Sequence, residues 1–545
     1  MGKSKTKTEV SAGDILENFG KYQIVQYFYL CLPPIFVSMI NVNYIFIAGE
    51  VNYRCRIPEC ETTGEYEAPW WPSTHTDQCT RPVLNYTYLK DNVCTNNSFT
   101  NAYTECTEWI YENNNTIVSE LNLACQPWQR SFVGVIHSLG VAVAMTVAGW
   151  LADTIGRKPT FIICAVGCIV GTLKSFATSY YVYIVLEFLD AAISGGASAT
   201  SSILMIEIGN TENRVLSGVL FAYAIYMGEA IFAIIAMLVP YWKSLIYIIY
   251  TPPLLFLVYI LILHESPRWL ILNGKVDEAK NILKKMIEQN KINTKIEDLE
   301  KLNKDTLKQA YNIKVDGKKE GYIDLFSCAE TLKRLIVAFV TRFAISYIYY
   351  GLVANSVWLP GNKYLFFLLG AIMSFPGELI SMYMMNKYGR KLPLILGYSL
   401  CGLMCILYGF APESVSWVKV GFFLGGKLLA SACFTGIVTF TMELFPTSVR
   451  GSVLGLCTLA YSGGIMLGLL TPMMASVSPL LAPITFGFAG AVSSALIFLT
   501  PETRHLPLFD TIEQVARSVA IAKNEKQMKQ MKEQDNKGFS NDEHI

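Results

Sequence analysis

Six of the ionisable residues inside long apolar runs of this 545-residue sequence are candidates for chemistry: Glu187, Asp190, Glu229, Arg342, Glu378 and Lys427. A charge in such surroundings is costly, so each is a candidate for function or for pairing with another charge. For Lys427, pairing with a carboxylate is the expected arrangement. Arg342 has two interpretations: a counter-charge for a ligand carboxylate, or a helix-end arginine whose guanidinium reaches the water interface. Glu378 follows Pro376-Gly377, where a broken helix would expose backbone to a cavity.

Aromatic side chains supply a second set of candidates, because the faces of Tyr and Trp attract ammonium groups. The sequence contains 30 tyrosines, so any one of them can equally belong to an interfacial belt or to ordinary packing. The candidates within or beside the apolar runs are Tyr44, Tyr223, Tyr226, Tyr347, Tyr349, Tyr350, Trp358 and Tyr461.

The elements that carry these residues are predicted to be membrane-spanning helices. Hydrophobic residues make up 52% of the chain and charged residues 16%, against about 25% charged in soluble proteins. Lipid offers no partners to backbone polar groups, and no alternating strands are visible, which favours an all-α membrane protein over a β-barrel. Twelve runs reach the length of about 20 residues that a span needs. They cover approximately 22–44, 131–152, 159–178, 181–206, 214–237, 242–263, 334–357, 361–385, 391–411, 416–442, 450–472 and 477–499.

The segment 45–128 is expected to be extracellular. It is polar and holds six of the fourteen cysteines, Cys55, Cys60, Cys79, Cys94, Cys106 and Cys125, with sequons at Asn85, Asn96 and Asn114. This combination indicates a disulfide framework in an oxidising space, although fifteen pairings are possible. The segment 264–333 contains fourteen Lys and Arg residues, against four in 45–128. The positive-inside rule therefore makes 264–333 and both termini cytoplasmic, in a multi-pass protein of the plasma membrane.

Short motifs recur in the two halves of the chain. Residues 153–158 (DTIGRK) match 386–391 (NKYGRK), and the Glu265 motif ESPR matches the ETR that begins at Glu502. A Glu and an Arg seven residues apart also recur, at offset 236. Three matches in order at offsets of 233 to 237 indicate an internal duplication, which is a recurring plan of transporters.

The duplication predicts two six-helix pseudo-repeats joined by a cytoplasmic linker. A helical face of Val276, Ala279, Ile282, Leu283, Met286 and Ile287 predicts an amphipathic helix within that linker. The end of the C-terminal tail is polar and expected to be disordered. The predicted parts are an N-terminal tail (1–21), an N-terminal bundle (22–263), a linker (264–333), a C-terminal bundle (334–499) and a C-terminal tail (500–545).

These motifs resemble those of the major facilitator superfamily. Residues 149–158 (GWLADTIGRK) resemble its loop 2–3 signature, and ESPR and PETR resemble its sugar-transporter-like branch. The cysteine-rich loop and residues 443–450 (ELFPTSVR) narrow the resemblance to the organic cation/anion/zwitterion transporters, and in particular to insect-type members. The resemblance covers about 20–515 and implies alternating-access transport of a small organic solute across the lipid bilayer.

The resemblance also implies that charges at the cytoplasmic helix ends form a network that breaks when the two halves rock. Because exposed ion pairs contribute about 0–1 kcal/mol each, several are needed to set a useful bias. Asn386 replaces Asp153 in the second copy, so the first copy is expected to hold more firmly, and Asp153→Asn is expected to alter turnover more than affinity. The gating candidates are Asp153, Arg157, Lys158, Glu207, Arg214, Glu265, Arg268, Arg390, Lys391, Glu443, Arg450, Glu502 and Arg504.

The resemblance also bears on the substrate. Cation carriers of the family have an acid before the Gly-Gly of the eleventh span, where this chain reads AYSGG at 460–464, and the arginine of the anion carriers is missing there too. Ser374 stands where an acid of the eighth span is expected, and Glu187 and Asp190 stand where the superfamily often has Arg and Gly. Organic cations or zwitterions, such as carnitine-like or amino-acid-like solutes, are the expected substrates. An organic anion or sugar carrier, or a non-transporting receptor, remains an alternative.

Other functions are not favoured. A net charge of +1 gives no electrostatic case for nucleic acid. Residues 421–427 read GFFLGGK, but Leu428 and the apolar context do not fit a nucleotide-binding loop. Hydrolase motifs do not occur, and His137 and His264 are isolated in the sequence. The expectation is a protein that is not an enzyme and has no cofactor, metal or nucleotide.

Overall fold

The computed structural model describes residues 19–61, 64–72, 77–85, 94–95, 98–209, 214–292, 299–300, 306–307, 325–326, 328–446, 449–504 and 512–515. These residues contain twelve helical segments that are long and apolar enough to cross a membrane. Each coincides with one of the twelve runs expected from the sequence, so the all-α membrane fold is confirmed. The helices satisfy their own backbone groups, which lipid requires.

Several of the twelve segments contain more than one helical element. The first six are built from α2 (Lys21–Val42) with α3 (Tyr44–Ile47), α5 (Pro127–Ile155), α6 (Arg157–Gly167) with the 3₁₀ helix η3 (Cys168–Phe176), α7 (Tyr180–Ser194) with α8 (Gly196–Ile208), α9 (Arg214–Leu238), and α10 (Trp242–Tyr250) with η4 (Pro252–Val258) and α11 (Tyr259–Ile262). The last six are built from α17 (Ala329–Asn355) with η5 (Ser356–Trp358), α18 (Lys363–Tyr388), α19 (Lys391–Phe410), α20 (Ser416–Leu444), α21 (Arg450–Leu469) with α22 (Thr471–Val477), and α23 (Leu481–Phe498).

One local expectation about these helices is wrong. The sequence suggested a break at Pro376-Gly377, but α18 continues through Pro376 from Lys363 to Tyr388. Small residues explain how the neighbouring helix accommodates this stretch. A Cβ on Gly377 would lie 2.2 Å from the Ser431 hydroxyl of α20, so the missing side chain allows close helix packing.

Packing divides the chain into two compact units. Unit 1 contains Met1–Ile313, Tyr350–Phe375 and Ile465–Ala482. Unit 2 contains Lys314–Tyr349, Pro376–Gly464 and Pro483–Ile545. Unit 1 therefore contains all of the first six segments, the end of α17 from Tyr350, the part of α18 up to Phe375, the end of α21 from Ile465, and α22. The predicted boundaries of the two six-helix bundles remain a prediction.

Within unit 1, α5 packs on α7 and α8, and α2 packs on α9 and α8. Small residues set the closeness of these contacts. A Cβ on Gly140 of α5 would lie 2.6 Å from the Ala191 Cβ of α7, and one on Gly196 of α8 would lie 2.5 Å from the Ala148 Cβ of α5. Such small-residue contacts are the usual means of tight helix packing in lipid.

The segment between α3 and α5 forms a small disulfide-linked substructure. Strand β1 (Tyr53–Cys55) pairs antiparallel with β4 (Trp109–Tyr111), and β2 (Thr80–Leu84) pairs antiparallel with β3 (Phe99–Glu105). The short helix α4 (Ile117–Glu120) follows. Of the fifteen pairings that the sequence left open, the structure has Cys55–Cys106, Cys60–Cys94 and Cys79–Cys125. The other eight cysteines are free, and six of them are buried, as expected for small apolar residues.

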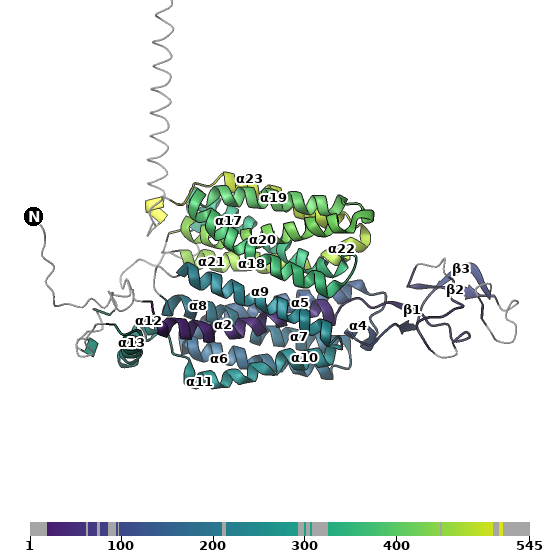
Figure 1. Ribbon diagram of the computed structural model, residues 1–545, viewed down its shortest axis with the longest axis horizontal. Coiled ribbons are helices and arrows are strands. Elements are labelled where there is room, and N and C mark those ends of the chain that lie inside the picture. Colours follow the sequence, from purple (N-terminus) through teal and green to yellow (C-terminus); the bar gives the residue numbers. More distant parts are fainter. Residues whose placement is uncertain are drawn as a thin grey trace, which may run out of the picture. The chain divides into compact units, whose positions relative to one another are not determined.

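The opposite end of unit 1 carries α12 (Pro267–Leu272) and the amphipathic helix α13 (Val276–Asn290), whose expected apolar face is largely buried. Figure 1 shows α12 and α13 at one end of the unit 1 helices and strands β1, β2 and β3 beyond the other. We call these the motif end and the disulfide end. Asn290 of α13 joins the first span at the motif end, because its Oδ1 accepts from the Tyr22 amide at 2.9 Å.

Candidate substrate-binding and gating sites

At the motif end of unit 1, one carboxylate holds the start of α6. Glu265 accepts hydrogen bonds from the backbone amides of Arg157 and Lys158, each at 3.1 Å, and from Ser266 at 2.8 Å. Gly156, immediately before α6, has a φ of 115°, which favours glycine. The Arg157 side chain continues the cluster by pairing with Glu207 at 3.1 Å. A carboxylate at a helix N-terminus is favoured by the free amides and by the helix dipole.

Unit 2 repeats this arrangement. Glu502 accepts from the backbone amides of Arg390 at 2.9 Å and Lys391 at 3.0 Å, and Gly389 before α19 has a φ of 95°. Arg390 pairs with Glu443 at 3.1 Å. The two lysines also match, since Lys158 Nζ donates to the Ile260 carbonyl and Lys391 Nζ to the Phe498 carbonyl, both at 2.8 Å. The sequence repeats therefore correspond to the same contacts in space.

The two copies differ where the sequence differs. Arg157 also pairs with Asp153 at 3.0 Å, and the second copy has Asn386 at that position. The Asp153 side chain is 75% exposed, so this extra pair contributes about 0–1 kcal/mol at most. In the second copy the Thr503 hydroxyl donates to Glu443 at 2.6 Å. Glu265 and Glu502 therefore make more contacts in these clusters than Asp153 does.

The remaining gating candidates are less engaged in the described structure. Arg504 donates to the Lys387 carbonyl at 2.7 Å. Arg268 is half-buried and makes no ion pair within the described residues. The side chains of Arg214 and Arg450 lie outside the described part of the chain. A gating role for the whole set stays a prediction.

Replacing Glu265 by glutamine is expected to cost about 1–3 kcal/mol, because charged acceptors form the stronger hydrogen bonds. Glu502→Gln should have a similar effect, since its carboxylate makes equivalent contacts. Asp153→Asn is the matched control, with a change below about 1 kcal/mol. Thermal unfolding of the three purified variants and their maximal uptake rates would check this order. An Asp153 effect as large as that of Glu265 would contradict it.

Burial of His264 beside two lysines lowers its pKa to about 4. Its Nε2 accepts from Lys285 Nζ at 3.1 Å, which requires a neutral ring. Between about pH 6.5 and 4 the unfolded histidine is protonated and the folded one is not, so acid should lower the free energy of unfolding there. His264→Gln should flatten this part of the pH dependence, measured by thermal unfolding. Parallel curves for the wild type and the variant would refute the assignment.

In unit 2, four substrate-binding candidates lie along a chain of aromatic rings. The Arg342 guanidinium lies 4.9 Å from the ring centres of both Phe434 and Tyr461, and it donates to the Phe434 carbonyl at 3.2 Å. Phe434 contacts Tyr349 at 5.2 Å between ring centres, and Lys427 Nζ lies 3.2 Å above the Tyr349 ring. The rings therefore connect two cationic groups across α17, α20 and α21, at distances that fit cation–π attraction.

Arg342 lies inside α17 rather than at its end. The helix begins at Ala329, thirteen residues earlier, which is about 20 Å of rise. The interpretation as a helix-end arginine is therefore wrong. Glu378 is the acidic member of this region: it is buried, and its Oε2 accepts from the Thr435 hydroxyl at 2.7 Å, one residue after Phe434. The sequence analysis missed Phe434, although it lies two turns from Lys427 on the same face of α20.

The aromatic candidates of unit 1 fall in two places. Tyr223 and Tyr226 of α9 pack against Phe375, with ring centres 5.1 and 5.7 Å apart. Tyr44 lies in a separate cavity, and Tyr350 is half-buried. The candidates are therefore distributed over both units, and their common membership of one binding site stays a prediction.

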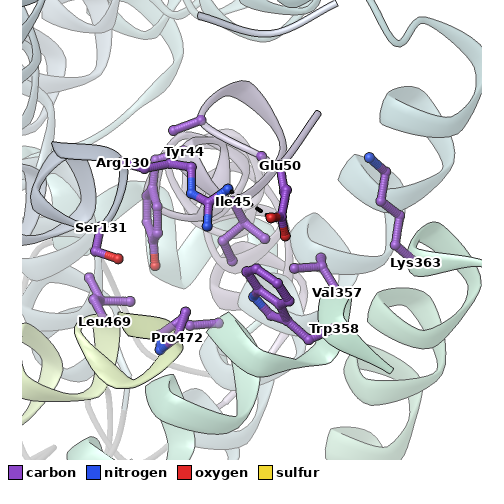
Figure 2. Close-up of a pocket in the computed structure, with 13 residues that line it drawn as sticks. Tyr44, Ile45, Glu50, Arg130, Ser131, Val357, Trp358, Lys363, Leu469 and Pro472 are labelled. Atoms are coloured by element: carbon purple, nitrogen blue, oxygen red, sulfur yellow. Dashed lines mark ion pairs between the residues drawn. The ribbon is translucent and has the colours of Figure 1, made fainter. Parts of the chain in front are cut away.

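The cavity that contains Tyr44 lies at the disulfide end of unit 1 and has a volume of about 130 Å³. Figure 2 shows Arg130 pointing toward Glu50, with a separation of 3.7 Å, and Trp358 below them. The Arg130 guanidinium lies 5.4 Å from the Trp358 ring centre. Lys363 of α18 also lines the cavity. The sequence analysis missed Glu50 and Arg130, which flank the apolar runs, and Lys363, which lies near the start of the run 361–385.

Two further expectations need correction. His137 is not isolated, because its Nδ1 lies 2.7 Å from Glu187 Oε1 in the interior of unit 1. Lys174 was missed, although it lies inside an apolar run and the presence of a charge there was the available signal. Its ammonium contacts both Glu187, at 2.9 Å, and Asp190, at 3.0 Å. It occupies the space between the two carboxylates of a cluster whose His and acids have the spacing of metal ligands.

The model of the sugar (and other) transporter family matches residues 82–515, which is most of the chain. The chain belongs to this family. It is 28% identical over 516 residues to an organic cation transporter protein of Drosophila melanogaster, covering 91% of this chain and 92% of that protein. It is 28% identical to solute carrier family 22 member 6-A of Xenopus laevis, covering 96% and 97% of the two chains.

The fold agrees with this membership. The partially occluded, inward-open structure of the xylose transporter XylE from E. coli matches with a TM-score of 0.61 at 14% identity, covering 89% of this chain and all of that one. This family member is therefore a multi-pass membrane transporter of the major facilitator type, related to organic cation transporters and to members of solute carrier family 22.

Proposed function

We propose that this family member carries small zwitterionic solutes, with an ammonium and a carboxylate, by alternating access. The observation that carries the proposal is the aromatic chain of unit 2, with Arg342 near Phe434 and Tyr461 and Lys427 above Tyr349. Two cationic side chains within a spanning region suit a substrate that brings a carboxylate, because a planar guanidinium binds carboxylates well.

The other end of a zwitterion requires acidic or aromatic partners. Glu378 supplies a buried carboxyl group next to the same aromatic chain. The faces of Tyr349 and Tyr461 suit a substituted ammonium. A solute with only a positive charge would face two cations and one acid in this region, so a plain organic cation is disfavoured. Two of the relatives are organic cation transporters by name, which supports the ammonium half of the proposal.

An organic anion is the second candidate, because Arg342 and Lys427 outnumber Glu378. A sugar is disfavoured, because it has no charged group that could pair with these side chains. We place the protein in the plasma membrane, with the disulfide-linked segment outside and both termini inside. Three disulfides and an exposed sequon at Asn114 support this orientation. Asn85 is half-buried, and Asn96 lies outside the described residues. In this arrangement the motif-end clusters act as the cytoplasmic gate.

Uptake by cells that express the full chain tests the proposal. The panel is radiolabelled carnitine, β-alanine, tetraethylammonium, urate and glucose, with untransfected cells as the control. We expect carnitine or β-alanine to exceed the control by about tenfold or more, with tetraethylammonium and glucose near it. Uptake of tetraethylammonium above that of both zwitterions would refute the substrate class. Uptake of urate alone would favour the organic anion.

A further inference from the structure

The interior of unit 1 contains a cluster of charges that the proposed substrate site does not use. Lys174 is fully buried, and its ammonium donates to Glu187 at 2.9 Å, to Asp190 at 3.0 Å and to the Tyr250 hydroxyl at 2.6 Å. Glu187 and Asp190 are both fully buried and lie three residues apart on α7, which places them on one face. Each partner of Lys174 therefore lies inside the protein.

His137 of α5 extends this cluster. Its Nδ1 lies 2.7 Å from Glu187 Oε1, and its Nε2 lies 3.1 Å from Asn41 Oδ1. A neutral imidazole has one donor and can satisfy only one of these two oxygens, whereas the imidazolium donates to both. With Asn41 in this orientation, the geometry is that of a protonated ring.

The charge count gives the same result independently. Two carboxylates and one ammonium leave a net charge of −1 when His137 is neutral, and zero when it carries a proton. An uncompensated buried charge is strongly unfavourable. The second oxygen of Asp190, Oδ1, is buried without a hydrogen-bond partner in the described part of the chain. The two carboxylates therefore have fewer hydrogen-bond donors than they can accept.

Besides Glu187 and Asp190, the described surroundings of His137 contain one further buried carboxyl group, Glu229 of α9, on the side of Tyr44. Outside the Lys174 cluster, the charged side chains on α6 and α8, which pack against α5, are Arg157, Lys158 and Glu207. All three make their contacts in the motif-end cluster. The helix α22 has no ionisable side chain. Tyr183 of α7, Tyr250 of α10 and Cys168 of η3 are further ionisable groups near the acids.

The cluster adjoins the cavity at the disulfide end. The ring of Tyr44, which lines that cavity, lies 6.2 Å from the His137 ring, and its hydroxyl has no partner among the described residues. Arg130, which also lines the cavity, lies two turns before His137 on the same face of α5. Asn41 is only half-buried. The Nε2 side of the imidazole, which faces Asn41, is therefore the less enclosed side of His137.

We propose that His137 and Glu187 form a proton-binding site that couples proton movement to solute transport by this protein. In the neutral ring Nδ1–H donates to the Glu187 carboxylate; the incoming proton binds Nε2, which then donates to Asn41 Oδ1, so the cluster goes from a net charge of −1 to zero. Release returns the imidazole to its neutral form. Because only the neutral cluster is stable when fully enclosed, proton loading favours the conformation in which His137 is shut off from water. The inference rests on the proposed transport function.

The test measures uptake of the best zwitterion of the panel into oocytes that express the full chain, at external pH 5.5 and 7.5. A gradient of about two pH units allows up to about 100-fold accumulation with one proton per solute, and we expect at least about fivefold faster uptake in the wild type. A protonophore should remove this stimulation. His137→Gln, which keeps a hydrogen-bonding side chain but cannot carry the proton, should bring the ratio to about one.

Counterflow exchange separates coupling from transport itself. With equal pH on both sides, Glu187→Gln should exchange labelled for unlabelled solute at a rate within about twofold of the wild type, because its cluster has zero net charge without a proton. His137→Gln keeps a net charge of −1 in the cluster and should exchange more slowly. His264→Gln is the matched control, since it removes a histidine at the motif end and should retain the stimulation. Should His137→Gln fail to reach the surface, Glu187→Gln replaces it, because its cluster has zero net charge without a proton and the ratio of uptake at the two pH values should likewise fall to about one.

Wild-type uptake that ignores the gradient, or a His137→Gln variant that keeps the stimulation, would overturn the proposal. If no zwitterion is taken up or exchanged by the wild type, the proposed substrate fails instead. The same gradient measurement is then made with whichever solute of the panel is carried.

Discussion

Arg342→Ala is expected to lower uptake of a zwitterion by about 30-fold or more while the protein still reaches the cell surface. Loss of a charged partner from a buried carboxylate contact costs about 2–5 kcal/mol. In this structure the guanidinium is half-buried mid-helix and held by Phe434 and Tyr461. The measurement is initial uptake of carnitine or β-alanine, normalised to surface-biotinylated protein.

Arg342→Lys is the matched control. It keeps the charge but loses the planar geometry that binds both oxygens of a carboxylate, so an intermediate loss is expected. Tyr461→Phe is a second control, because it keeps the ring against the guanidinium and should have a small effect. Unchanged uptake by Arg342→Ala would remove this residue from the site. A loss that follows surface abundance would show that Arg342 supports the fold.

Lys174→Met is expected to have the largest effect on stability of any single substitution considered for this protein. It leaves Glu187 and Asp190 without their shared ammonium, and both carboxylates are fully buried. Removing one partner of a buried ion pair costs about 3–5 kcal/mol. The expected result is a large fall in the melting temperature of the purified protein, or its absence from the membrane.

A double variant distinguishes the charge from the volume of the side chain. Lys174→Met combined with Asp190→Asn removes one charge of each sign, so it should recover part of the loss that Lys174→Met causes alone. Lys284→Met on the exposed face of α13 is the control for lysine replacement and should change little. Equal melting temperatures for Lys174→Met and Lys284→Met would show that the buried cluster does not stabilise the fold.

The twelve helices could be predicted because a span is a local property. A run of about 20 apolar residues, such as 242–263, must form a helix in lipid whatever its neighbours are. The repeated motifs could also be predicted as a pair, since their spacing is visible in the sequence. Their contacts, with Glu265 and Glu502 each bound to the first amides of a helix, required the structure, because more than 100 residues separate the partners.

The candidate sites were predicted less completely. Charges inside the apolar runs indicated Arg342, Glu378 and Lys427, but not that Phe434 links Arg342 to Tyr349. His137 looked isolated because Glu187 is 50 residues away in the chain, and only the packing of α5 on α7 brings them within 2.7 Å. The continuity of α18 through Pro376 depended on close packing against α20, which local sequence does not reveal.

The sequence by itself determined that the chain crosses lipid twelve times, that it carries a cysteine-rich segment, and that its two halves share their motifs. Hydrophobic run length, cysteine content and repeat spacing are properties of the sequence itself, so they can be read without knowing which helices pack together. The tertiary structure decided which cysteines pair, which buried acids share Lys174 and which rings surround Arg342. These depend on side chains that meet across different helices, and apolar helices of similar composition do not specify from sequence which faces will meet.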